Sequence, residues 1–142
     1  MRKFVITLVF LLITAHYITP QNAKSYAQKA KFIVNFTLFT VWPNENPETD
    51  TSLIGVYGKA HMTKAINQVI DQRQNINRRL KAIPLDNISK RTPPEGLKVI
   101  YVASENARAK HVGAYIEQRP ILTVGDNNKC TDNSFMLNLG NT

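Results

Sequence analysis

The sequence predicts a single three-layer α/β domain with a largely parallel, Rossmann-like sheet and helices on both faces. Short apolar strands alternate with helical segments along the chain, which is typical of this class. The strands expected at 97–103 and 120–124 are almost continuously apolar, as in strands that are buried on both faces. The joins between segments are short, and right-handed crossovers then place helices on both sides of the sheet.

The segment KAKFIVNFTLFTVWP near the start of the chain is its most aromatic part. Four aromatic residues are spaced four, three and three positions apart, which places them on one side of an α-helix: Phe32, Phe36, Phe39 and Trp42. Alternate residues are also apolar, as in a strand, but the lysines and alanine that open the segment favour a helix, and Pro43 ends it. These aromatic side chains are expected mainly in the core.

The remaining elements follow from apolar periodicity and turn residues. Strands are expected at 53–57, 79–84, 97–103, 120–124 and 134–139, with 79–84 as an exposed strand. Helices are expected at 62–73 and from 104 or 106 to about 118, and 44–52 is a polar loop.

The first 27 residues have the features of a secretory signal peptide. A basic start is followed by the apolar run 4–13, which is too short to span a bilayer. The small residues around Tyr26 favour cleavage after Ala27, which leaves 28–142 as the folded domain. The sequence therefore predicts an exported protein, with an N-terminal membrane anchor as the alternative.

The chain is basic, with a formal net charge of +8. Removal of residues 1–27 leaves 15 basic and 10 acidic side chains, a net charge of +5. This charge suits a protein close to anionic headgroups or wall polymers, at most peripheral to the membrane. Nucleic acid is not an expected partner of an exported chain. The one compact basic cluster, Arg78, Arg79 and Lys81, is expected to be a solvated strand edge.

Several segments resemble, in order and spacing, those of the YfiR-like family of bacterial periplasmic proteins. They are the aromatic segment above, LIGVYG at 53–58, LKVIYVAS at 97–104, RPILTVGD at 119–126 and FMLNL at 135–139. The resemblance covers nearly everything after the leader. It also implies a further strand and a C-terminal helix, which this sequence, ending at Thr142, is expected to lack.

Catalytic groups are sparse, and the chain is not expected to be an enzyme. Cys130 is the only cysteine, so no intramolecular disulfide can form. His61 and His111 have no ligand-spaced neighbours, so neither a metal nor another cofactor is expected. An exported hydrolase that uses Cys130 with one of these histidines remains an alternative hypothesis.

Four residues follow predicted strands and form a candidate ligand site: Gly58, Lys59, Ser104 and Asp126. The carboxyl ends of parallel strands usually form the ligand crevice of such a sheet, and helix N-termini attract anions. Ordinary turn chemistry is the competing interpretation. The site would suit a periplasmic small-ligand-binding protein that serves a sensor kinase or a transporter.

The resemblance implies a different function, that of a periplasmic regulatory protein. Such proteins bind the sensor domain of a membrane-bound, YfiN-like diguanylate cyclase, hold it inactive and lower cyclic di-GMP signalling, on which biofilm formation depends. Phe39 and Trp42 are the candidate anchors for this partner, with core burial as the competing expectation. Another sensor protein as the partner, and a homodimer, both remain open.

Overall fold

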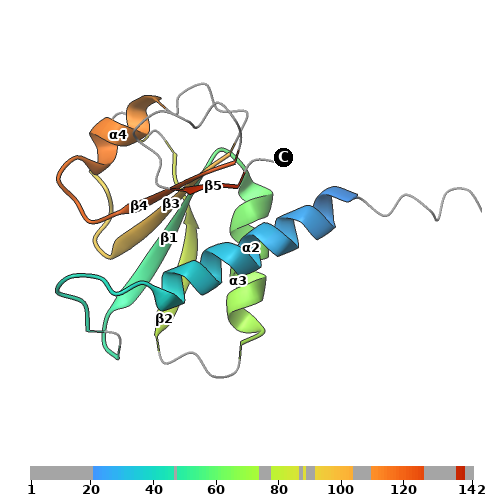
Figure 1. Ribbon diagram of the computed structural model, residues 1–142, viewed down its shortest axis with the longest axis horizontal. Helices are drawn as coiled ribbons and strands as arrows, with labels where there is room; N and C mark the ends of the chain where they lie inside the picture. The colour runs from blue at the N-terminus through green and yellow to red at the C-terminus, as the bar shows by residue number, and fades with distance from the viewer. Residues whose placement is uncertain are drawn as a thin grey trace, which may run out of the picture.

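The computed structural model describes residues 21–46, 48–73, 78–86, 88, 92–103, 110–126 and 137–139. In this part of the chain, five strands form one sheet in the order β2-β1-β3-β4-β5, and all neighbouring strands are parallel (Figure 1). The strands are β1 (Thr51–Tyr57), β2 (Arg79–Pro84), β3 (Leu97–Val102), β4 (Leu122–Gly125) and β5 (Leu137–Asn138). The helices are α2 (Gln21–Phe39), α3 (Ala60–Asp71) and α4 (Lys110–Ile116). The predicted α/β class and parallel sheet are confirmed.

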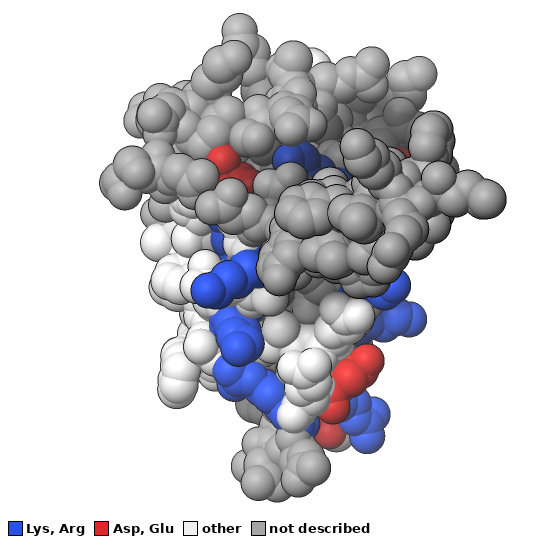
Figure 2. Space-filling view, turned by 90° about the vertical axis from the view of Figure 1, so that its right-hand side faces the viewer, with Lys and Arg blue, Asp and Glu red and all other residues white. Residues whose placement is uncertain are grey.

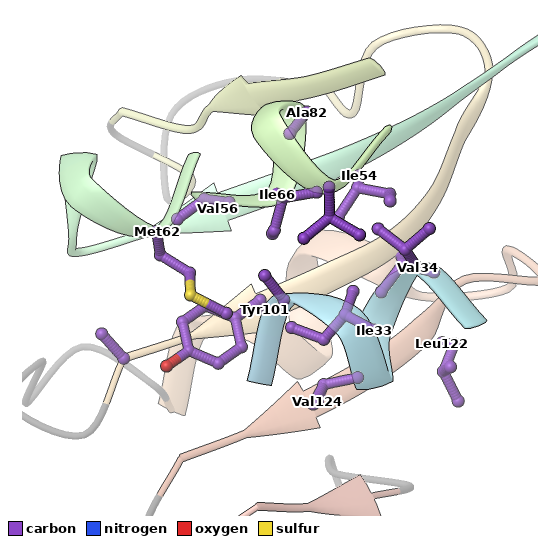
Figure 3. Packing of buried hydrophobic residues seen from close by; sticks show 14 of the residues in the cluster. Ile33, Val34, Ile54, Val56, Met62, Ile66, Ala82, Tyr101, Leu122 and Val124 are labelled. Atoms are coloured by element: carbon purple, nitrogen blue, oxygen red, sulfur yellow. The ribbon is translucent and has the colours of Figure 1, made fainter. Parts of the chain in front are cut away.

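The sheet separates two apolar cores, which confirms the three-layer prediction. Helices α2 and α3 cover one face, and α4 lies on the other (Figure 1). In the α2–α3 layer, Ile33 and Val34 of α2 and Ile66 of α3 converge on Ile54 of β1 (Figure 3). The second core gathers Val112 of α4 with residues of β3 and of the segments after β2 and before β4.

Strand β3 occupies the centre of the sheet and is buried on both faces, as its apolar run predicts. Val99 and Tyr101 point into the α2–α3 core, whereas Ile100 and Val102 point into the α4 core. All four side chains are fully buried. This strand therefore anchors both layers.

Gly55 in β1 leaves room for a side chain of the neighbouring segment. A Cβ atom at this position would lie 2.9 Å from Cγ of the buried Leu85 and 3.0 Å from Cδ1 of Leu97. Cβ atoms in proteins essentially never come closer than 3.0 Å to such an atom, so an added Cβ would force the Leu85 side chain to move. Glycine here therefore lets Leu85 pack directly against the sheet.

Strand β2 lies at one end of the described sheet, and a side chain of α3 covers part of its open edge. Asn67 Nδ2 donates a hydrogen bond of 3.0 Å to the Ala82 carbonyl, and the Ala82 N–H donates one of 2.9 Å to Asn67 Oδ1. An edge strand normally presents such groups to any extended chain that approaches. At Ala82 the asparagine amide takes the place that a neighbouring strand would occupy.

The aromatic segment is helical as predicted, but α2 begins earlier than 29 and ends at Phe39, before Trp42. Its buried face also differs from the expectation. The buried residues recur at helical spacing and are Ala30, Ile33, Val34 and Thr37. The branched aliphatic side chains thus fill the space against the sheet. Phe32 and Phe39 are exposed, and Phe36 is partly buried at the margin of this core.

Candidate partner-binding site

The carboxyl end of the sheet holds three of the four predicted ligand-site residues. Gly58 and Lys59 follow β1, and Asp126 follows β4, whereas Ser104 lies outside the described residues. Gly58 is exposed and has φ 107°, a left-handed conformation that favours glycine. Lys59 precedes α3, and its Nζ lies 5.7 Å from the centroid of the Tyr26 ring. This end of the sheet therefore contacts the first turns of α2.

The Asp126 carboxylate is bound by other groups of the chain. Its side chain is only 4% exposed. The Tyr101 hydroxyl donates a 2.5 Å hydrogen bond to Oδ2, and Lys29 of α2 forms an ion pair with Oδ1. A buried carboxylate needs such partners, because an unpaired charge is costly to bury. A small cation would therefore compete with Lys29 for this carboxylate.

Arg78 is not part of a solvated strand edge, so this part of the sequence prediction was wrong. Its side chain is 11% exposed and its Nη1 donates hydrogen bonds to the Thr37 and Thr40 carbonyls, at 2.8 and 3.0 Å. Nη2 lies 3.1 Å from Glu45 Oε2, an ion pair without hydrogen-bond alignment. A cation at the last carbonyls of a helix is favourable. Its neighbour Arg79 is exposed, as predicted.

The Glu45 side chain explains why Arg78 folds inward. It is only 1% exposed, and its second oxygen accepts a hydrogen bond from Ser52. The loop at 44–52 reads as merely polar in the sequence, and nothing in its composition separates this glutamate from its exposed neighbours. The contact joins residues 33 positions apart, which is why sequence spacing did not indicate it.

Only one of the two predicted partner anchors is exposed. Phe39 is 85% exposed at the end of α2, whereas Trp42 is 7% exposed and packs in the α2–α3 core. Core burial, the competing expectation, therefore holds for Trp42 and is wrong for Phe39. Sequence reasoning missed Val41, which is 90% exposed, and did not foresee that Phe32 is 43% exposed.

The two described histidines lie on helices that cover opposite faces of the sheet. His61 is exposed on α3 and His111 is exposed on α4. Cys130, the third residue of the hydrolase hypothesis, lies outside the described residues. Within the described ranges, no three His, Cys, Asp or Glu residues are grouped closely enough to hold a metal ion.

Basic side chains gather on the face shown in Figure 2, where Lys and Arg form a file across the described surface with few acidic groups beside it. Both helices of the α2–α3 layer carry exposed lysines. They are Lys24 and Lys31 on α2 and Lys64 on α3. Among the helices that the structure describes, none has the length and apolar character needed to cross a membrane.

Comparison with known families finds a match over most of the chain. The profile of a family described as YfiR/HmsC-like matches residues 26–142. The match begins close to the expected start of the mature domain and includes every described strand. No curated protein matches the chain.

Proposed function

Because the chain belongs to the YfiR/HmsC-like family, as its sequence resemblance predicted, we propose that it is a periplasmic repressor of a membrane-bound diguanylate cyclase. In this proposal the protein is exported, binds the sensor domain of the cyclase and favours its inactive state. It acts by binding and carries out no chemistry of its own. The family match across 26–142 is the observation on which the proposal depends.

The outer side of α2 supports a binding role. Phe39 and Val41 are the most exposed large apolar side chains among the described residues. Arg78 binds the carbonyls on either side of Phe39, at positions 37 and 40, and so fixes the helix end that carries it. An apolar anchor that is already held in place loses little conformational entropy on binding. This end of α2 is therefore suited to an interface.

Repression by binding has a definite energetic requirement. The repressor shifts the cyclase only by the difference between its affinities for the inactive and the active state. To change a population from 1:99 to 99:1, that difference must be about 5.5 kcal/mol, or roughly 10⁴-fold in affinity. A few well-packed apolar anchors can supply a difference of this size if the surface of the cyclase that they contact is present only in its inactive state.

A deletion strain tests the proposal directly. Loss of the gene should raise cellular cyclic di-GMP, and the chain expressed from a plasmid should restore the original level. A version without residues 1–27 should fail to restore it, because it would stay in the cytoplasm. Unchanged cyclic di-GMP in the deletion strain, measured under conditions in which the cyclase is produced, would overturn the proposal.

A further inference from the structure

The outer side of α2 carries an apolar stripe that we call the aromatic ridge, formed by Phe32, Phe36 and Phe39 and continued by Val41. The three phenylalanines are spaced four and three residues apart, so they lie along one side of the helix. Phe32 and Phe39 lie roughly opposite the buried face of α2, because each residue advances the helix by about 100°. Phe32, Phe39 and Val41 are 43%, 85% and 90% exposed, whereas Phe36 is partly buried and packs against the margin of the α2–α3 core.

The aromatic ridge is preorganised. The rings of Phe32 and Phe36 are stacked, with centroids 6.1 Å apart and planes inclined by 25°. The last turn of the helix is tied to Arg78, and Asn35 on the adjoining side accepts a hydrogen bond from Arg73 at the end of α3. A partner would therefore meet a fixed row of apolar side chains on a helix, against which the apolar side of a second helix can pack.

The charge around the aromatic ridge indicates which kind of partner fits. Helix α2 contains three lysines and no acidic residue. Lys29 is paired with Asp126, but Lys31 is exposed and would remain after cleavage at Ala27. The chain that remains after this cleavage carries +5, so a second copy would meet like charge. An acidic partner would meet opposite charge.

We propose that the aromatic ridge and Lys31 form the docking surface for an amphipathic helix of the protein partner, with an apolar stripe that packs on the phenylalanines and acidic residues that face Lys31. This inference rests on the proposed function, and it places the acidic helix in the sensor domain of the cyclase. The apolar stripe supplies affinity, and the acidic flank selects the orientation.

Site-specific photo-crosslinking in living cells tests the contact. A photoreactive amino acid at Phe39 should crosslink to an epitope-tagged diguanylate cyclase of the same genome, and peptide mapping should place the crosslink in an acidic amphipathic helix. The same probe at Ala114, which is exposed on α4 across the sheet, serves as the control and should give no such product. Thermal unfolding of each purified variant verifies that it is folded.

Binding of the purified sensor domain tests the charge. Phe39→Ser and Lys31→Glu should each weaken binding at least 10-fold, and Lys31→Glu should be rescued by an acid-to-lysine change in the mapped helix. Lys81→Glu makes the same charge change on β2 and should leave the affinity within twofold. Higher salt should weaken binding of the original chain more than that of Lys31→Glu.

The outcomes separate this inference from the proposed function. Crosslinks from Phe39 only to a second copy or to lipid, or cyclase crosslinks from Ala114 and not from Phe39, would overturn the docking surface. In those cases a deletion strain with raised cyclic di-GMP would still support repression. If neither position crosslinks to a cyclase and cyclic di-GMP does not change on deletion, both proposals fail.

Discussion

Replacement of Arg78 by alanine should destabilise the fold far more than its position beside an exposed arginine suggests. The change removes the cation that faces Glu45, whose side chain is 1% exposed, and leaves that carboxylate buried without a counter-charge. Breaking a buried ion pair in this way costs about 3–5 kcal/mol. Since a small domain has about 5–15 kcal/mol in total, the variant should be close to the limit of stability.

Urea unfolding measures this loss, with Trp42 as the reporter. Trp42 is the only tryptophan, it is 7% exposed, and it lies in the segment that Arg78 holds. With a slope of about 2 kcal/mol per molar urea, the expected loss lowers the midpoint by about 1.5–2.5 M. Circular dichroism over the same transition tests whether the whole domain unfolds together.

Two further variants make the Arg78 prediction specific. Arg79→Ala changes an exposed neighbour and should alter stability by no more than about 0.5 kcal/mol. The double variant Arg78→Met with Glu45→Gln should be more stable than Arg78→Met alone, because it leaves no unpaired buried charge. Equal midpoints for Arg78→Ala and Arg79→Ala would refute the reasoning.

Three other perturbations test separate features. Gly55→Ala should cost about 1–3 kcal/mol by overpacking, seen as a lower urea midpoint, and an unchanged midpoint would contradict the close approach of the leucine that follows β2. Asn67→Ala removes two hydrogen bonds to Ala82 and should cost about 1–3 kcal/mol; size-exclusion chromatography should also show concentration-dependent association, unlike for the original chain. The Asn46 N–H donates a hydrogen bond to the Asp50 carboxylate and holds the pKa of that carboxyl below its usual 3.8. The stability that this hydrogen bond contributes should therefore be fully present above pH 3.8 and be lost as the pH falls through the folded-state pKa. An NMR titration that gives Asp50 a higher pKa would exclude that contact.

The fold could be predicted from the sequence because its strands differ sharply from their surroundings. Residues 99–102 of β3 are apolar without interruption, and a strand of that kind requires cover on both faces. The strand at 79–84 was predicted with the bounds that the structure gives, because its alternation is bordered by charged and proline residues. Local pattern was sufficient in both cases.

The orientation of α2 could not be predicted in the same way. Two apolar stripes share this helix, one aromatic and one aliphatic, and both have helical spacing. Hydrophobicity alone favours the phenylalanines for the core. The sheet instead accepts Ile33 and Val34, which pack closely against the β-branched surface of the strands. Which stripe is buried depends on how the side chains of α2 fit against the strands of the sheet, and that fit cannot be read from the sequence of the helix alone.

The candidate site was predicted only in part for a similar reason. Phe39 was named as an anchor on the grounds of residue type and family resemblance, and it is exposed. Trp42 was named on the same grounds and is buried, because α2 ends at Phe39 and the helical spacing no longer sets the direction of its side chain. Contacts such as Lys29 with Asp126 join residues 97 positions apart and leave no local signal.

The amide of Asn67 has a consequence for how recognition of this protein can change over time. With the Ala82 backbone already occupied, an extended peptide gains little by aligning with β2, and main-chain pairing is the mode of contact that tolerates almost any sequence. On this side of the molecule, association is then left to side chains, where each contact depends on the identity of a residue. A protein built in this way can acquire a new partner through a few surface substitutions while the strands beneath stay the same.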